Sequence, residues 1–304
     1  MVRNAAFDYA RLAAAFGIVW FHVGAPGAEI GYAGLPFFLL VLVIFALPGA
    51  GRQGFRPFVS NRAQRLMLPF FIWSTIFGLL KLADVALTDS TLASEFQLGM
   101  LVTGPALHLW FLPFAFVICL ILHPVAHWMT HADTSKQVAA ASLSLATLGF
   151  LALEQQWHPG IPLQQWLFAM PAVTLGLAMA IWPRAAPAFV GGIGLVALLA
   201  DWTNGSLQIL IAAALVLACR FMPLPESRLS QLCARLSMGI YLCHPLIVSA
   251  LVRAVGLPAQ SVILAVVACL GAASLALVLP GHGSPNLPNR RLRKPADPLP
   301  RPKR

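Results

Sequence analysis

An arginine and a histidine bound an otherwise apolar stretch near the N-terminus, RLAAAFGIVWFH, which runs from Arg11 to His22. At 100° per residue, their separation along the chain brings them to within about 20° of each other on one face of a helix. The same separation extends over roughly 16 Å of helix axis, so the two side chains cannot touch. A polar face on an apolar helix is expected to point into a helix bundle or a wet cavity, where ionisable groups are functional candidates.

Each of these two residues also has a structural interpretation. The Arg11 side chain can extend to the cytoplasmic headgroups and pair with Asp8, three positions earlier, and His22 can lie at the outer membrane interface. If both instead serve one reaction, a long molecule must lie between them. An acyl-coenzyme A (acyl-CoA) fits that requirement, because its phosphates and its reactive thioester lie at opposite ends of a slender arm.

A second pair of arginines occurs in SNRAQRLMLP, residues 60–69. Arg62 and Arg65 are three positions apart where we expect the third apolar helix to begin on the cytoplasmic side, and Ser60 or Asn61 can cap that helix. Guanidinium groups and the unpaired N–H groups of a helix N-terminus both bind phosphate, so this pair predicts an anion site. The alternative is ordinary positive charge on the cytoplasmic side of a membrane protein.

The elements that must position these residues are membrane helices. Of the 304 residues, 59% are hydrophobic and 10% are charged, and the mean hydropathy is +0.80, whereas soluble domains have about 25% charged residues. The sequence predicts an all-α, polytopic transmembrane bundle of about ten spans in one membrane domain, residues 1–280. A basic, Pro-rich, disordered cytoplasmic tail, residues 281–304, is predicted to follow it. The predicted spans cover about 5–23, 31–49, 66–83, 107–129, 138–153, 164–182, 187–201, 206–222, 235–253 and 259–280.

Charge is distributed unevenly between the loops on the two sides of these spans. The segments 50–65 and 220–235 and the tail contain most of the 20 Lys and Arg residues, and only Lys81 and Arg253 fall near the outer ends. This asymmetry follows the positive-inside rule and predicts that both termini lie in the cytoplasm. The acidic residues of the predicted outer loops are Glu29, Asp84, Asp89, Glu95, Glu154 and Asp201.

Several functional classes find no support in the sequence. The net charge of +10 follows from the positive-inside pattern, so it requires no nucleic-acid partner, and the basic tail can contact anionic lipid headgroups of the bilayer. The five cysteines form no CxxC pair and no His/Cys spacing suggests zinc, so we expect no metal site. The motifs of phosphate-binding loops, dinucleotide sites and serine nucleophile elbows are missing, so we expect no permanently bound cofactor.

Four stretches, in order along the chain, resemble landmarks of the acyltransferase 3 family of integral-membrane acyltransferases. They are FDYARLAAAFGIVWFH, with its Arg11 to His22 spacing, RAQRLMLP, HLWFLP at 108–113, and LSMGIYLCHPL at 236–246. The similarity covers nearly the whole chain, and the predicted number of spans also agrees with the family. One difference is that the second span reads FFLLVL at 37–42, where family members often have FFxxSG.

The resemblance implies O-acyl transfer, usually of an acetyl group, from cytosolic acyl-CoA to a carbohydrate hydroxyl at the outer face of a bacterial inner membrane. His22 would be the general base or a transient acyl carrier, and the sequence does not separate these roles. Arg11, Arg62 and Arg65 would hold the CoA phosphates, and Glu29 would orient the His22 imidazole from the outer loop. The implied partners are an acceptor of the exopolysaccharide, glucan or O-antigen type and proteins of polysaccharide assembly.

Two further pairs of polar residues lie in later landmarks. His108 and Trp110 begin the fourth span at its outer end, at the predicted depth of His22, and can shape the acceptor site, although Trp110 can instead belong to an interfacial aromatic belt. Tyr241 and His244 lie in the ninth span beside Pro245. We expect them to form hydrogen bonds between helices near a proline kink, with a pore-lining role as the alternative.

A transporter or flippase for a lipid-linked glycan or a small solute is the alternative function, because a bundle of about ten helices with charged groups inside the membrane fits it too. Such a protein is expected to show paired repeats, or helices broken by Gly and Pro in corresponding halves, and we find no convincing internal repeat. An acyltransferase should bind or slowly hydrolyse labelled acetyl-CoA, whereas a transporter should not.

Overall fold

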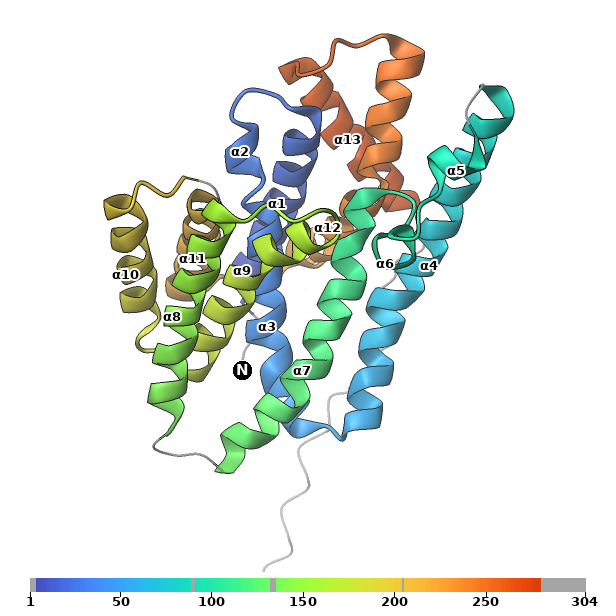
Figure 1. Ribbon diagram of the computed structural model, residues 1–304. Coiled ribbons are helices and arrows are strands. Elements are labelled where there is room, and N and C mark those ends of the chain that lie inside the picture. Colours follow the sequence, from blue (N-terminus) through green and yellow to red (C-terminus); the bar gives the residue numbers. More distant parts are fainter. Residues whose placement is uncertain (1–3, 89–90, 132–134, 204, 280–304) are drawn as a thin grey trace, which may run out of the picture.

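The computed structural model describes residues 4–88, 91–131, 135–203 and 205–279. Within these ranges the regular secondary structure is helical throughout, and no strand occurs. Most of the long helices run alongside one another in a bundle (Figure 1). Asp89 and the tail 281–304 lie outside the described residues, so the outer position of Asp89 and the disorder of the tail stay predictions.

Each of the predicted spans contains a helix. The elements are α1 (Ala6–Val23), α2 (Ala28–Gly31), α3 (Gly34–Arg52), α4 (Phe55–Leu87), α5 (Leu92–Glu95), α6 (Met100–Thr103), the 3-10 helix η1 (Leu107–Trp110), α7 (Phe111–His131), α8 (Ser135–Gln156), α9 (Leu163–Ile181), α10 (Ala186–Leu199), α11 (Ser206–Phe221), α12 (Arg228–Ala250), the π-helix η2 (Leu251–Val255) and α13 (Val262–Val278). Six helical segments of the described residues are long and apolar enough to cross a membrane, and α10, α11 and α13 are shorter apolar helices. Helix α1 is in neither group, because Asp8, Arg11 and His22 reduce its hydropathy. The number of membrane crossings stays a prediction.

The helix that contains the arginine pair begins earlier than predicted. Helix α4 begins at Phe55, whereas the sequence predicted a helix N-terminus capped by Ser60 or Asn61. The helix extends toward the N-terminus beyond the apolar stretch. Pro57 is tolerated because it lies in the first turn of the helix. The predicted cap is therefore wrong, and Arg62 lies inside a helix rather than at an N-terminus with unpaired N–H groups.

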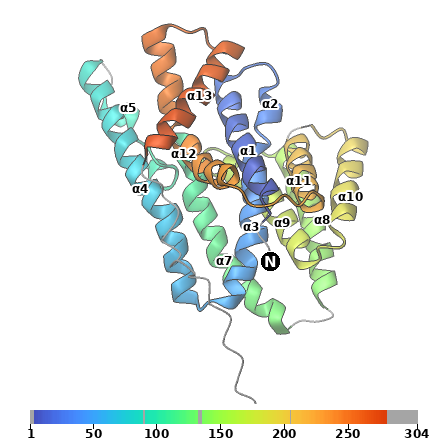
Figure 2. The same ribbon diagram turned by 180° about the vertical axis from the view of Figure 1, so that it is seen from behind.

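Helix α1 contacts α2, α3, α11, α12 and α13. Seen from behind, α12 crosses beside α1 and continues toward α13 (Figure 2). The contact between α1 and α2 requires glycine, because a Cβ on Gly31 would collide with the carbonyl oxygen of Gly17. A Cβ on Gly34 would likewise collide with the carbonyl oxygen of Ala14. These close approaches fix the second half of α1 against α2 and the beginning of α3.

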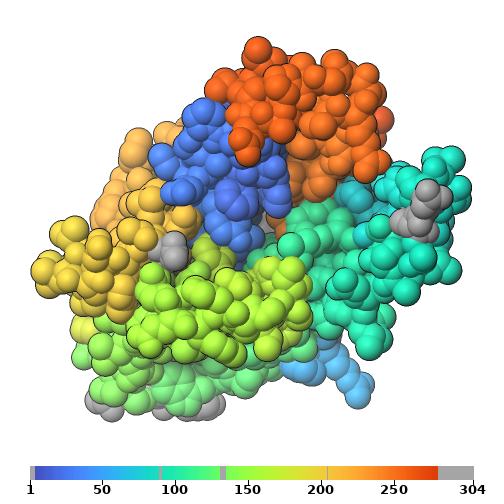
Figure 3. All heavy atoms as spheres, turned by 45° about the horizontal axis from the view of Figure 1, so that its top comes forward, coloured from blue at the N-terminus to red at the C-terminus, as the bar shows by residue number. Residues whose placement is uncertain are grey.

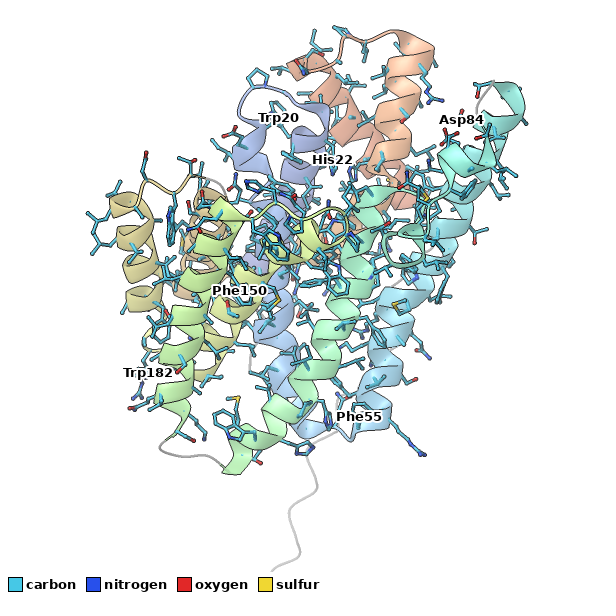
Figure 4. The ribbon with its side chains drawn as sticks, in the orientation of Figure 1. Trp20, His22, Phe55, Asp84, Phe150 and Trp182 are labelled. Atoms are coloured by element: carbon cyan, nitrogen blue, oxygen red, sulfur yellow. The ribbon has the colours of Figure 1, made fainter. Side chains whose placement is uncertain are left out.

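The two ends of the bundle hold different segments of the chain. Trp20, His22 and Asp84 lie toward one end, and Phe55 and Trp182 lie toward the other (Figure 4). We call these the His22 end and the Phe55 end. Asp84, from a predicted outer loop, thus lies at the first end, and Phe55, from the predicted cytoplasmic segment 50–65, lies at the second.

The two cations that the sequence places near the outer ends are each paired with an acidic residue. Lys81 Nζ lies 2.8 Å from a Glu95 carboxylate oxygen, and Arg253 Nη1 lies 3.3 Å from an Asp84 carboxylate oxygen. The Arg253 pair is largely exposed, so it adds little to the free energy of unfolding. Both pairs nonetheless cancel positive charge at the His22 end.

Candidate active site

Three imidazole rings and one phenol ring meet toward the His22 end. His22 comes from the last turn of α1, His108 from η1, and Tyr241 and His244 from α12. The ring centroids of His22 and His244 are 4.8 Å apart, and those of His108 and His244 are 5.2 Å apart. The ring centroid of Tyr241 lies 5.7 Å from that of His108. We call these four residues the histidine cluster.

The sequence around His244 explains the orientation of its ring. Pro245 has no backbone N–H, so the carbonyl of Tyr241, four positions before it, lacks its usual helical donor. The Nδ1 atom of His244 lies 2.7 Å from that carbonyl oxygen. Because a carbonyl oxygen only accepts, Nδ1 carries the hydrogen, and in a neutral ring Nε2 keeps its lone pair. That Nε2 atom is buried and has no hydrogen-bond partner among the described residues.

Two hydrogen bonds fix His108 against α12. The Tyr241 hydroxyl donates to the backbone carbonyl of His108, and His108 Nε2 lies 3.3 Å from the carbonyl oxygen of Leu242. By the same argument, Nε2 of His108 carries the hydrogen. Tyr241, His108 and His244 are all buried. These bonds join η1 to α12 and hold the buried side of the histidine cluster.

His22 is the exposed member of the cluster. It lies two residues before Gly24, whose φ of 72° ends α1. Its side chain is exposed, whereas His108 and His244 are 6% and 0% exposed. A molecule that approaches from the His22 end therefore meets the His22 imidazole before the ring of His244. No group of three or more His, Cys, Asp or Glu in the described part of the chain is arranged to hold a metal ion.

The three arginines predicted to bind the donor lie away from this cluster. Arg11 Nη1 lies 3.3 Å from a carboxylate oxygen of the buried Asp8, and its guanidinium carbon is 5.8 Å from the ring centroid of Phe45. Arg62 is partly buried and Arg65 is exposed. The expected pairing of Arg11 with Asp8 is therefore present.

Arg11 and Arg62 approach the same side of α3 from two different helices. Arg11 contacts Phe45, and a Cβ on Gly49 would lie 3.9 Å from Arg62 Nη2. Phe45 and Gly49 are one turn apart on α3, so they share one face of that helix. Neither of them is buried. The two guanidinium groups therefore flank an accessible strip of α3.

The face of α1 between Arg11 and His22 is closed. Ala15 and Ile18 occupy this face on successive turns, and they are 0% and 1% exposed. A long molecule can lie along this face only if the packing around these two side chains opens. The structure thus groups His22 with other histidines and separates it from the arginines.

Two of the predicted acceptor-site residues lie outside the histidine cluster. Trp110 is 3% exposed and its ring contacts those of Phe111 and Phe114, so it packs in the core and not in a lipid-facing belt. Glu29 lines a separate cavity of about 930 Å³ that His22 does not line. No hydrogen bond or ion pair joins Glu29 to His22 among the described residues, so the structure does not support its predicted contact with the imidazole.

The residues that share this cavity with Glu29 are not predicted from the sequence. Glu154, Gln165 and Gln208 line it, whereas the sequence marks Glu154 only as a residue of a predicted outer loop and assigns no role to the two glutamines. The sequence does contain one indication of these residues, because all three are polar and lie close to the ends of helices that reach the His22 end. What the sequence lacks is any indication that these helix ends meet.

Comparison with known proteins gives one result. A family model described as an acyltransferase domain matches residues 4–280, which is nearly the whole chain. The matched range includes the histidine cluster and all three arginines. Neither the curated proteins nor the solved structures include a match.

Proposed function

The chain belongs to the acyltransferase 3 family, and from this membership we propose that it is a multi-pass membrane O-acyltransferase that uses acyl-CoA. It moves an acyl group, with acetyl as the expected one, from cytosolic acyl-CoA to a hydroxyl of an extracytoplasmic carbohydrate. One observation carries the proposal at the level of residues. The exposed imidazole of His22 lies against the buried, oriented ring of His244.

In the simplest form of this reaction, His22 is the general base. A sugar hydroxyl is a poor nucleophile, and a neutral imidazole takes its proton as the oxygen attacks the thioester carbonyl carbon. The C–S bond then breaks, the acyl group stays on the sugar oxygen, and the CoA thiolate takes the proton from His22. In the covalent alternative, a His22 nitrogen attacks the thioester carbon and the CoA thiolate leaves. The sugar oxygen then attacks the acyl-imidazole, the bond to the His22 nitrogen breaks, and the CoA thiolate takes the sugar proton.

The position of His244 supports this role of His22. Its Nδ1–H donates to the Tyr241 carbonyl, so its Nε2 atom is left as an unpaired acceptor in the buried part of the cluster. A proton gained by His22 creates positive charge and a new N–H beside that ring. A fixed acceptor in a site of low dielectric constant stabilises such charge without rearrangement.

The donor phosphates are proposed to bind Arg11, Arg62 and Arg65. Arg11 and Arg62 flank one accessible strip of α3, and Arg65 follows Arg62 on the next turn of α4. Guanidinium groups bind phosphate through paired N–H donors. Roughly 16 Å of α1 separates Arg11 from His22, which matches a donor with a long arm. Because Ile18 and its neighbours are packed, the arm reaches His22 only when the helices beside α1 separate locally.

The proposed setting is a bacterial inner membrane, with about ten crossings and both termini in the cytoplasm. The Phe55 end then faces the cytoplasm and the His22 end faces the periplasm. The acceptor is an exopolysaccharide, glucan or O-antigen glycan, supplied by proteins of polysaccharide assembly. The basic tail 281–304 contacts anionic headgroups, and acyl-CoA is a substrate and not a permanently bound cofactor.

Labelled acetyl-CoA and purified protein in lipid nanodiscs test this proposal. The wild type is expected to bind acetyl-CoA and to hydrolyse it slowly to acetate and CoA. His22→Gln keeps the size of the side chain and some hydrogen bonding but removes the base. Its turnover should fall by about 10²–10⁴-fold while acetyl-CoA still binds.

A histidine near the Phe55 end provides the matched control. His127 is exposed, and its ring contacts His123, which in turn contacts Phe55, so His127→Gln should turn over like the wild type. Near-normal turnover of His22→Gln would end the catalytic assignment. Movement of a glycan or solute across the membrane, with no binding of acetyl-CoA, would instead favour a transporter or flippase.

A further inference from the structure

The cavity of about 930 Å³ lies at the His22 end, where residues of α1, α2, α8, α9, α10 and α11 line it. Figure 3 views this end, with blue α2 near the yellow-green α8–α9 segment and the yellow α10–α11 segment. Three aromatic rings form one wall, since Tyr32 stacks on Phe21 at 4.1 Å and on Phe168 at 4.6 Å between centroids. Phe21 also contacts the ring of His22 at 5.5 Å. Phe21 therefore belongs to the cavity wall and also contacts one member of the histidine cluster.

The lining of this cavity is acidic. Glu29, Glu154 and Asp201 contribute carboxyl groups, and no Lys or Arg of the described residues lines it. Among the described lining residues His158 is the one other ionisable basic side chain, so three carboxyl groups face at most one positive charge there. A ligand with a positive charge gains favourable electrostatic energy here, the more so because the site is partly buried.

The cavity also presents hydrogen-bond acceptors that are not used. Glu154 and Gln208 are each only 9% exposed. Glu154 Oε2, Gln165 Oε1 and Gln208 Oε1 have no hydrogen-bond partner in the described part of the chain, and all three residues line the cavity. A buried acceptor without a donor is unfavourable. Several of them around one cavity indicate a ligand that donates several hydrogen bonds.

We propose that this cavity binds an amino sugar with a free ammonium group, as one unit of the acceptor glycan. That this sugar is a unit of the acceptor glycan rests on the proposed function. The ammonium group donates to the carboxyl groups, and the sugar hydroxyls donate to the glutamine oxygens. The stacked rings and Trp202 provide aromatic faces for the cation and the apolar face of the sugar. Binding of one unit here places the adjoining unit of the glycan toward His22, on the other side of Phe21.

Ligand binding without acyl-CoA tests this proposal. The probes are a glucosamine trimer and the fully N-acetylated trimer, which has the same backbone but no positive charge, and the protein is held in nanodiscs without phosphatidylethanolamine. We expect the wild type to bind the glucosamine trimer roughly tenfold more tightly or better, as the loss of one charge-assisted hydrogen bond implies. Free ethanolamine, which has the ammonium group of a common lipid headgroup but no sugar ring, should compete far more weakly.

Two conservative variants locate the site. Glu154→Gln and Asp201→Asn each remove an ionisable carboxyl group and keep the shape of the side chain, and asparagine tolerates the φ of 52° at position 201. Each should bring the ratio of the two affinities toward one. Asp201 is exposed, so its variant keeps the test valid if Glu154→Gln does not fold. His127→Gln should keep the ratio of the wild type, because His127 lies toward the Phe55 end and does not line the cavity.

Equal binding of the two trimers by the wild type would overturn the proposal, and so would a preference that persists in both charge variants. Competition by ethanolamine as strong as that by the glucosamine trimer would overturn the sugar assignment. Selective binding without any use of acetyl-CoA would support the cavity and contradict the proposed function. Acyl transfer to a glycan, with no selective binding of the glucosamine trimer, would support the proposed function and contradict the proposal for the cavity.

Discussion

At the scale of single residues, the three histidines of the cluster differ in which nitrogen atoms are free. His108 and His244 each give an N–H to a backbone carbonyl, at 3.3 and 2.7 Å. The contacts of His22 are ring contacts with Phe21 and His244. A fixed N–H sets the tautomer of an imidazole and the direction of its lone pair. The two buried rings are therefore oriented, and the exposed ring is the one that can exchange a proton with a substrate.

A charge-conserving substitution tests the role of the arginine pair. Arg62→Lys should weaken acyl-CoA binding although the charge is kept, because the planar guanidinium fork that binds phosphate is lost. Arg62→Ala should weaken it further, since a hydrogen bond to a charged group contributes about 1.5–3 kcal/mol. Calorimetric titration with acetyl-CoA measures both, and the same pair of variants at Arg65 extends the test.

Arg253→Lys is the control for this series, because Arg253 pairs with Asp84 at the opposite end of the bundle. Its affinity for acetyl-CoA should equal that of the wild type. Full affinity in the Lys and Ala variants of both Arg62 and Arg65 would mean that the pair only marks the cytoplasmic side.

At the scale of helices, the sequence predicted the existence of the elements better than their ends. A run of about 20 apolar residues is recognisable without knowledge of its neighbours, and each predicted span contains a helix. The first turns of α4 were missed because residues 55–65 are polar enough to resemble a loop. The energy that keeps such residues helical comes from the continuing backbone hydrogen bonds and from packing, and local composition does not record it.

The candidate site depends even more on contacts between helices. The spacing of Arg11 and His22 reveals a shared face, but the ring of His244 reaches His22 only because α12 packs against α1. The cavity lined by Glu154 and Gln208 draws its residues from helices far apart in sequence. A single sequence carries no record of which helix ends meet, so this acidic cavity could not be predicted from it.

The proline of α12 provides a test of this arrangement. Pro245→Ala restores a backbone N–H that can donate to the Tyr241 carbonyl, and this donor competes with His244 Nδ1–H. The ring of His244 then loses its fixed orientation. Turnover should fall by about 10–100-fold, the range found for groups that orient metal-bound histidines, while acetyl-CoA binding and thermal stability are kept.

A second helix-interior proline serves as the control for this variant. Pro124 lies in α7 next to His123, whose ring contacts Phe55, and Pro124→Ala should leave turnover unchanged. If Pro245→Ala instead turns over like the wild type, the orientation of His244 has no part in the reaction, and its hydrogen bond to Tyr241 serves packing alone.

At the scale of the whole molecule, the bundle has two chemically different ends. Arg62 and Arg65 lie on the half of α4 nearer the Phe55 end, whereas the histidine cluster and the acidic cavity lie toward the His22 end. Helix α1 carries both Arg11 and His22, and under the proposed function it fixes the distance between the donor phosphates and the site of acyl transfer. Such an arrangement suits transfer between a donor on one side of a membrane and an acceptor on the other. The proposed function therefore requires that the Phe55 end face the cytoplasm.

The orientation is tested with one introduced cysteine at each end. Gln97 and Gln53 are both exposed, the first between α5 and α6 and the second between α3 and α4. Four native cysteines are buried and Cys269 is partly buried, so the wild type serves as the background for labelling. With both termini in the cytoplasm, an impermeant maleimide should label Gln97→Cys in intact cells and Gln53→Cys only after the membrane is opened. Labelling of Gln53→Cys in intact cells would reverse the bundle, place the arginines outside, and remove cytosolic acyl-CoA as the donor.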